Sequence, residues 1–157
     1  MKPVISFSKV DLPYGWMGNM APFPIVYENK KWLTTEALFQ AMRFKDEKIK
    51  EEIRAEKSPM SAKMKAKKYK DQYAVIPMSE KDVENMKLCV NLKVEQHPEL
   101  KKKLLITGKY DIYEDIGKRN GERHFFWGAK RENDKWIGNN MMGKIWMELR
   151  ETIKSEI

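Results

Sequence analysis

The sequence is poor in the residues that usually build thiol, imidazole or metal chemistry. Among 157 residues there is one cysteine, Cys89, and there are two histidines, His97 and His124. A single cysteine excludes an internal disulfide, which is typical of a reducing compartment, so we expect a cytoplasmic protein. Neither histidine has metal-ligand spacing with Cys89, so we predict no metal site. Cys89 lies in an apolar, helix-like stretch, where core packing is a commoner role than nucleophilic catalysis.

Long hydrophobic runs are also missing. No run approaches the roughly 20 residues needed to cross a bilayer, and the first residues, 1–4, lack the apolar core of a signal peptide. We therefore expect no membrane partner. Hydrophobic residues make up 41% and charged residues 34% of the chain, as in folded soluble proteins. No repeat, low-complexity segment or linker divides the sequence, which predicts a single domain over residues 1–157.

Two common catalytic motifs are absent. There is no glycine-rich loop of the dinucleotide or nucleoside-triphosphate type and no nucleophile elbow. The reactive groups that remain are carboxylates, lysines and amides. A carboxylate suits cleavage of a glycosidic bond, where it stabilises a cationic sugar or activates water, and an unprotonated lysine suits Schiff-base chemistry with an opened sugar.

The positive charge is unevenly placed. The formal net charge of +8 favours anionic partners, either nucleic acid or phosphorylated small molecules. Lysines cluster at residues 63–70 and 101–103. A solvated helix face is the commoner meaning of such a run. Because there is no long arginine-rich stripe, we do not expect a dedicated nucleic-acid coat.

The patterning predicts a predominantly α-helical α+β protein with a few short strands. Side-chain caps favour helix starts at Thr34 or Thr35, at Ser58 before Pro59, and at Ser79. The expected helices cover about 35–44, 46–56, from 59, 80–96, 98–107 and 140–154. The expected strands cover residues 4–8, a hairpin at 25–33, and an extended segment at 110–114.

The first predicted helix carries an unusual polar stripe. Glu36, Gln40 and Arg43 fall within about 60° of one another on a helical wheel, and the rest of the circumference is apolar. Such a stripe must be solvated, paired internally or lining a cavity, because a buried carboxylate without a partner is costly. Gln40 can bridge Glu36 and Arg43. The plainer interpretation is a capping Glu36 with a solvated strip.

Residues 126–150 combine turn, amide and flat aromatic residues. Glycines, the adjacent Asn139 and Asn140, and three tryptophans occur here, with a charged loop expected between Gly128 and Gly138. Tryptophan offers a rigid wall for a base or sugar, and asparagine offers both a donor and an acceptor. Two interpretations stand side by side: a pocket edge, or a loop that caps a core helix.

Taken together, short segments in a fixed order resemble the NADAR family, also called YbiA-like. The segments are Gly15 to Met20, Trp32 to Phe44, Ser58 to Lys63, Leu92 to Leu100, Leu104 to Gly108, Glu114, Phe126 to Gly128, and Asn140 to Arg150. The resemblance covers nearly the whole chain. It implies a helix-rich α+β domain that binds an ADP-ribose-containing or phosphoribosyl ligand and has N-glycosidase activity without a cofactor or metal. Members of the family hydrolyse riboflavin-pathway intermediates or remove ADP-ribose from guanine in nucleic acid, and they occur beside toxin systems and in phages.

The resemblance also implies site residues, which we take as predictions. The implied catalytic residues are Glu36, Glu114 and Lys63. The implied ligand-binding residues are Trp16, Gly18, Asn19, Gln40, Arg43, Lys93, His124, Trp127, Gly128, Asn140 and Gly143. Within this set, Trp16 or Trp127 would stack on a base, Asn19 and Asn140 would hold ribose hydroxyls or phosphate, and Lys63, Lys93 and Arg43 would neutralise phosphates. Some of these residues also have a competing structural interpretation. Trp127 would lie in the core, Lys63 and Lys93 would lie on a solvated surface, and Asn140 would be a simple N-cap.

Three departures from the family pattern bear on function. Arg43 stands where lysine is usual, His124 where aspartate is usual, and Gly18 and Met20 where serine and phenylalanine are usual. Arginine cannot form a Schiff base and stays charged. We expect cleavage of an ADP-ribosyl adduct, most of all ADP-ribosylated guanine in DNA or RNA. The alternatives are a riboflavin-intermediate N-glycosidase and a non-catalytic ADP-ribose sensor. The sequence carries no signal of oligomeric state.

Overall fold

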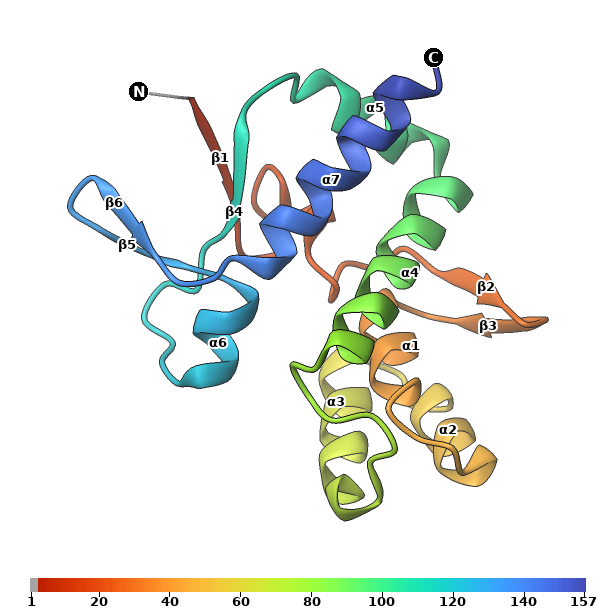
Figure 1. The fold of residues 1–157 in the computed structure, drawn as a ribbon. Helices are drawn as coiled ribbons and strands as arrows, with labels where there is room; N and C mark the ends of the chain where they lie inside the picture. The colour runs from red at the N-terminus through yellow and green to blue at the C-terminus, as the bar shows by residue number, and fades with distance from the viewer. Residues whose placement is uncertain (1–2) are drawn as a thin grey trace. The chain divides into compact units, whose positions relative to one another are not determined.

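The structure is a computed structural model that describes residues 3–157. Within that range the chain forms seven helices and several short strands (Figure 1). The helices are α1 (Thr35–Ala41), α2 (Glu47–Arg54), α3 (Pro59–Lys68), α4 (Glu80–Gln96), α5 (Pro98–Ile106), α6 (Glu122–Trp127) and α7 (Met141–Ser155). The strands are β1 (Val4–Phe7), β2 (Ile25–Tyr27), β3 (Lys30–Trp32), β4 (Asp111–Glu114), β5 (Lys130–Glu132) and β6 (Lys135–Ile137). The predicted helix-rich α+β class is confirmed.

The contacts within the chain form two compact units. The first unit contains residues up to Gly18 together with Pro98–Ile157, and the second contains Asn19–His97. In the first unit β1 pairs in parallel with β4, and Phe7 lies opposite Glu114 at the end of the ladder. Helix α7 runs along β4 (Figure 1). The indole Nε1 of the buried Trp146 donates to the carbonyl oxygen of Met17 at 3.1 Å. This bond connects α7 to the short helical turn Gly15–Met17.

Part of this unit differs from the sequence-based expectation. The segment expected to be a charged loop is an antiparallel hairpin, β5–β6, turned at Asn133 with a positive φ of 58°. It follows α6, a short helix that was not predicted. The strands carry mostly charged side chains and show no apolar alternation, so the usual signal is missing. A tertiary contact supports the hairpin instead, because the Trp136 ring stacks on Tyr113 of β4 at 4.6 Å.

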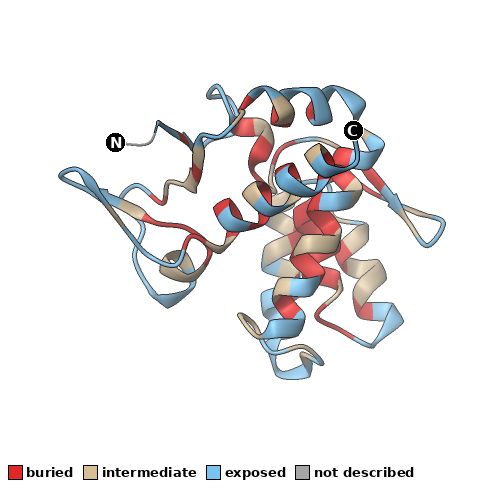
Figure 2. Ribbon diagram, turned by 45° about the horizontal axis from the view of Figure 1, so that its top comes forward, coloured by how far each residue is buried: buried red, intermediate tan, exposed pale blue. Residues whose placement is uncertain are grey.

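In the second unit α1 is surrounded by other elements. It packs against α2, α3, α4 and β3, and every one of its seven residues is buried (Figure 2). The Thr34 side chain accepts from the backbone N–H of Ala37, which confirms the predicted cap. The helix ends at Ala41, earlier than the predicted Phe44. A helix enclosed on several sides cannot carry a solvated strip, so that interpretation of its polar residues is wrong.

Local side-chain caps set the other helix starts in this unit. Ser58 and Ser61 form a reciprocal capping box at α3, and Ser79 caps α4, both as predicted. On α4, Cys89 is fully buried, and burial raises the pKa of its thiol far above the ordinary range. The expected core position is confirmed. None of the helices in residues 3–157 has the length and apolarity that crossing a membrane would require.

Candidate functional site

The predicted site residues fall into two groups, one in each unit. The group in the second unit is Asn19, Glu36, Gln40, Arg43, Lys63 and Lys93. The group in the first unit is Trp16, Gly18, Glu114, His124, Trp127, Gly128, Asn140 and Gly143. Among residues 3–157, no cluster of three or more histidine, cysteine, aspartate or glutamate side chains is placed to hold a metal ion. Together the two groups contain carboxylate, amide, amine, guanidinium, imidazole and aromatic side chains.

The polar stripe predicted for residues 36–43 is buried and internally connected. The residues Glu36, Gln40 and Arg43 are only 8%, 6% and 7% exposed. The Gln40 amide links the other two, since its Nε2 donates to Glu36 Oε1 at 3.5 Å and its Oε1 accepts from Arg43 Nη1 at 3.4 Å. The bridging role that the sequence allows for Gln40 is therefore present. A carboxylate in this position is held by neighbours rather than by bulk water.

Arg43 forms a two-point ion pair with Asp82 of α4. Its Nε donates to Oδ1 at 2.9 Å and its Nη2 donates to Oδ2 at 2.8 Å, in the fork geometry that suits arginine and carboxylate. Burial by itself lowers the pKa of Arg43, but the hydrogen bonds and charge of Asp82 outweigh it, and the pKa is raised. The guanidinium also lies 4.7 Å from the Phe39 ring centre. Arg43 thus has an internal counter-ion, which competes with the predicted phosphate contact.

Asp82 is the neighbour of the polar stripe that sequence reasoning missed. It is fully buried, and its Oδ2 also accepts from the backbone N–H of Met78 at 2.8 Å. The only local signal is its place three residues after the cap Ser79, which is a usual position for an acidic residue. Its partner Arg43 lies 39 positions away, and no spacing rule connects the two.

Asn19 lies at the start of α1, next to Glu36. The backbone N–H of Glu36 donates to the Asn19 carbonyl oxygen at 3.1 Å, and the Thr35 hydroxyl donates to Asn19 Oδ1 at 3.0 Å. Asn19 Nδ2 points to the sulfur of Met86 at 3.0 Å. The structure thus brings Asn19 and Glu36 together, as the predicted site requires. It also places the carboxylate in the first turn of a helix, where the helix dipole stabilises negative charge.

The two candidate lysines of this unit differ in their surroundings. Lys93 on α4 is fully buried, so the solvated-surface interpretation is wrong for it, and its Nζ lies 5.3 Å from the Phe23 ring centre. Burial lowers the pKa of Lys93 to about 7, because desolvation disfavours the charged amine. A lowered pKa favours the unprotonated amine, which is the form that base or nucleophilic chemistry needs. Lys63 is half-buried on α3.

In the first unit, the amide of Asn140 holds the strand that carries Glu114. Asn140 occupies the N-cap position of α7, as that interpretation expects, but it is buried in a left-handed conformation with φ of 53° and its side chain makes no capping hydrogen bond to the helix. Its Oδ1 accepts from the backbone N–H of Glu114 at 3.0 Å, and its Nδ2 donates to the Ile112 carbonyl oxygen at 2.8 Å. Both ends of the amide are bound to the backbone of β4. The proposed contact to ribose or phosphate must therefore compete with these bonds.

Gly143 and Gly128 pack closely against the same strand. A Cβ on Gly143 would collide with the Ile112 carbonyl oxygen and with the Asn140 amide. A Cβ on Gly128 would lie 2.7 Å from the Glu114 carbonyl oxygen, which also accepts from the backbone N–H of Ala129. These glycines allow the chain to approach β4 where a side chain would not fit. Close packing against β4 is therefore sufficient to explain why both positions are glycine.

The aromatic and remaining candidates of the first unit have varied environments. Trp127 is 9% exposed and meets Phe126 edge-on at 4.9 Å, which favours the core interpretation. Trp16 is half-buried and lies edge-on to Trp146 at 5.5 Å. His124 is half-buried on α6, and its Nε2 lies 3.2 Å from Arg123 Nη2. Gly18 closes the short turn after Trp16, its N–H donating to the Gly15 carbonyl oxygen.

Comparison with known proteins decides the family. The NADAR domain profile matches residues 6–154. The chain belongs to the NADAR family. N-glycosidase YbiA of Escherichia coli (strain K12) is 34% identical over 155 residues, which cover 98% of this chain and 90% of that protein. The NMR structure of E. coli YbiA superposes with a TM-score of 0.77 at 32% identity, covering 99% of this NADAR chain and 87% of the YbiA chain.

A second type of relative is longer. A riboflavin biosynthesis protein of Vibrio vulnificus (strain YJ016) is 27% identical over 155 residues, which are 98% of this NADAR chain but 40% of the Vibrio protein. The predicted family resemblance is thus confirmed over nearly the whole chain, and the fold is that of YbiA.

Proposed function

We propose that this NADAR protein is an N-glycosidase that hydrolyses the bond between ADP-ribose and guanine in ADP-ribosylated nucleic acid. The observation that carries the proposal is the environment of Glu36. Its carboxylate is buried in the first turn of α1, is hydrogen-bonded by Gln40, and lies beside Asn19. Burying a carboxylate costs stability unless it is paired and hydrogen-bonded, and a catalytic role is a reason to keep one there. Stabilising a cationic sugar or activating water is the use that fits a member of this family.

In the proposed reaction the carbon–nitrogen bond between the ribose anomeric carbon and guanine breaks. The bonding electrons leave with the guanine nitrogen, and the positive charge that develops on the sugar is stabilised by the Glu36 carboxylate. Water attacks the anomeric carbon as the carboxylate accepts its proton, and that proton then passes to the departing guanine. Glu114, Lys63 and Lys93 stay candidates for a second acid or base and for phosphate contacts.

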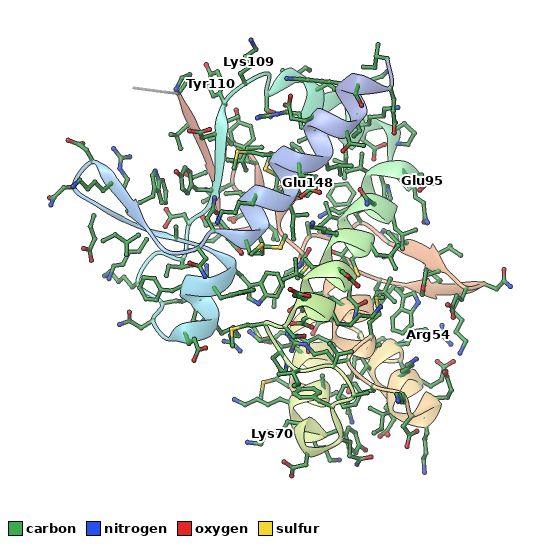
Figure 3. All side chains as sticks on the ribbon, viewed as in Figure 1. Arg54, Lys70, Glu95, Lys109, Tyr110 and Glu148 are labelled. Carbon is green, nitrogen blue, oxygen red and sulfur yellow. The ribbon has the colours of Figure 1, made fainter. Side chains whose placement is uncertain are left out.

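The substitution Glu36→Gln tests the proposal. An oligonucleotide that carries ADP-ribosylated guanine is incubated with each protein, and released ADP-ribose is measured. Wild type releases ADP-ribose, and Glu36→Gln is expected to lower the rate by about 10²-fold or more, since a positioned acid or base contributes about that factor. Glu95→Gln is the matched control, because Glu95 is an exposed carboxylate on α4 (Figure 3). Full activity in Glu36→Gln would remove Glu36 from the mechanism.

Two alternatives each have an observation in their favour. The similarity to a riboflavin biosynthesis protein favours an N-glycosidase that acts on a phosphoribosyl intermediate of that pathway. Arg43 in place of lysine, with its charge matched by Asp82, favours a sensor that binds ADP-ribose without cleaving any adduct. Turnover of the riboflavin intermediate and not of the guanine adduct would establish the first. Calorimetric binding of ADP-ribose without turnover of either substrate would establish the second.

A further inference from the structure

Helix α3 presents an outer face that the core does not use. The opposite side of the helix is fixed inside the second unit, where Ala62 and Ala66 are 1% and 0% exposed and the helix packs against α1 and α2. On the outer side Met60 is 53% and Met64 is 55% exposed. Two solvent-exposed methionines one turn apart leave a small apolar strip in water.

Lysines lie on both sides of this methionine pair. At 100° per residue, Lys63 and Lys67 fall on one side of Met60 and Met64, and Lys68 falls on the other, all within about 140° of the helix circumference. Residues 57–70 contain six lysines and no acidic residue. We call this outer surface, made by Met60, Met64, Lys67, Lys68 and the following Lys70, the α3 face. It combines concentrated positive charge with a short apolar centre.

Much of this charge lacks a matching carboxylate. Lys65 is paired with Glu56, in the segment between α2 and α3, at 3.5 Å. Within residues 3–157 no ion pair is formed by Lys67, Lys68 or Lys70, whose residues are all exposed. Lys70 lies at the outer end of α3 in Figure 3. Like charges held close together repel, and an anion bound across them relieves that repulsion.

We propose that the α3 face is a docking surface for the phosphate backbone of nucleic acid. The lysines would contact successive phosphates, and the methionines would contact the apolar faces of sugars or bases. The proposal rests on the proposed function for its purpose, since α3 packs directly on α1, the helix that carries Glu36. A strand held on the outer face of α3 would lie one helix away from α1. Docking on a single helix face does not require a long arginine-rich stripe, so the proposal is compatible with the absence of such a stripe from the sequence.

An anionic membrane is a poorer fit to the same surface. A membrane-binding helix buries a broad apolar face in the lipid, whereas here only two methionines are available. The helix is also held to the protein by its buried alanines, so it cannot turn its inner side outward. Three exposed lysines with little apolar area match a phosphodiester chain better.

The test is binding of a short, unmodified, fluorescent single-stranded oligonucleotide, followed by anisotropy over a range of salt concentrations. The variant Lys67→Gln/Lys68→Gln/Lys70→Gln is compared with Lys101→Gln/Lys102→Gln/Lys103→Gln. The control removes the same number of positive charges from exposed positions on α5. Near 0.1 M salt the α3 variant is expected to bind about 10- to 100-fold more weakly than wild type. The slope of log affinity against log salt is expected to fall by about 2, with the control close to wild type.

Two further variants separate the contribution of positive charge from that of the apolar methionine side chains. Lys67→Arg/Lys68→Arg/Lys70→Arg keeps the charges and is expected to keep binding. Met60→Ser/Met64→Ser is expected to weaken binding without changing the salt slope. The proposal is overturned if the α3 glutamine variant binds like wild type. It is also overturned if the α5 control loses binding equally, which would mean that only net charge matters, or if vesicles of anionic lipid bind through α3 and the oligonucleotide does not.

One comparison keeps this inference distinct from the proposed function. The α3 glutamine variant should hydrolyse the free ADP-ribosylated guanine nucleoside at the wild-type rate while losing rate on the oligonucleotide adduct at low substrate concentration. Equal loss on both substrates would contradict a docking role. If wild type cleaves no adduct, the proposed function fails, whereas oligonucleotide binding that depends on α3 would still stand.

Discussion

Arg43 and Asp82 bind each other through two parallel hydrogen bonds inside the protein, at 2.9 and 2.8 Å. The arginine lies two residues after the last residue of α1, and the aspartate is in the first turn of α4. The pair fixes the exit of the helix that carries Glu36 against the long helix of the same unit. It also gives Arg43 a structural role in this chain.

We expect Asp82→Asn to lower the free energy of unfolding by about 3–5 kcal/mol, because it leaves the buried guanidinium without its counter-charge. Urea unfolding followed by circular dichroism measures the change. Asp71→Asn removes an exposed carboxylate in the same unit and should change stability by less than about 0.5 kcal/mol. Equal stability of the two variants would show that the pair is unimportant for folding.

Arg43→Lys is expected to cost about 1–3 kcal/mol, since an ammonium cannot reproduce the fork of the guanidinium. If the sensor alternative is correct, the same substitution restores the usual family residue and should raise turnover from none to a measurable rate. An increase in turnover together with a decrease in stability would separate the two roles of this position. If neither turnover nor stability changed, the result would contradict both the sensor alternative and the structural role of the Arg43–Asp82 pair.

Asn140→Asp tests the amide that binds β4. A carboxylate still accepts from the Glu114 N–H but cannot donate to the Ile112 carbonyl oxygen, and it places negative charge against that oxygen. We expect a loss of about 1–3 kcal/mol in the free energy of unfolding, seen as a lower Tm. Asn139→Asp, at the exposed neighbouring residue, is the control. A Tm equal to wild type would mean that the amide contacts contribute little.

Gly143→Ala should destabilise the first unit by at least about 1–3 kcal/mol, the usual range for overpacking. The added methyl group meets the backbone of β4 and the Asn140 side chain, neither of which can move without breaking the Asn140 bonds. Gly117→Ala is a useful comparison, because no atom lies within 4 Å of a Cβ there, although its φ of +61° adds strain. Thermal unfolding of the two variants separates collision from strain.

Lys93 should make stability depend on pH in the alkaline range. Its pKa is lowered by burial from 10.5 to about 7, so between these values the unfolded chain binds a proton that the folded chain does not. The free energy of unfolding therefore gains a contribution that rises with pH from about 7 toward 10.5, at up to about 1.4 kcal/mol per pH unit. Below pH 7 both states are protonated and the contribution is constant. Lys93→Met should flatten this rise, and Lys102→Met, at an exposed position, should not.

Local side-chain chemistry explains which parts of the fold were predictable. Thr34, Ser58 and Ser79 each bind the backbone of the turn that follows them, so the sequence within a few residues contains the information. The hairpin β5–β6 was missed because its strands are charged, and its support comes from the distant Tyr113. Short elements of this kind are decided by tertiary contacts rather than by periodicity.

The candidate site shows the same division. The stripe of Glu36, Gln40 and Arg43 follows from helical spacing alone, and the bridging by Gln40 is local. The pairing of Arg43 with Asp82 joins residues 39 positions apart, and the bonds from the Asn140 side chain to β4 join residues 26 and 28 positions apart. No pattern within one helix or one loop contains these contacts.

The burial of Cys89 offers a practical route to locating bound partners. It is the only cysteine of the chain, and its thiol is fully buried with a raised pKa, so the folded protein should react very slowly with maleimides. A cysteine introduced at one exposed position can therefore carry a single dye or photo-crosslinker without removing the native residue. Slow modification of Cys89 itself would then report how often the α4 region opens.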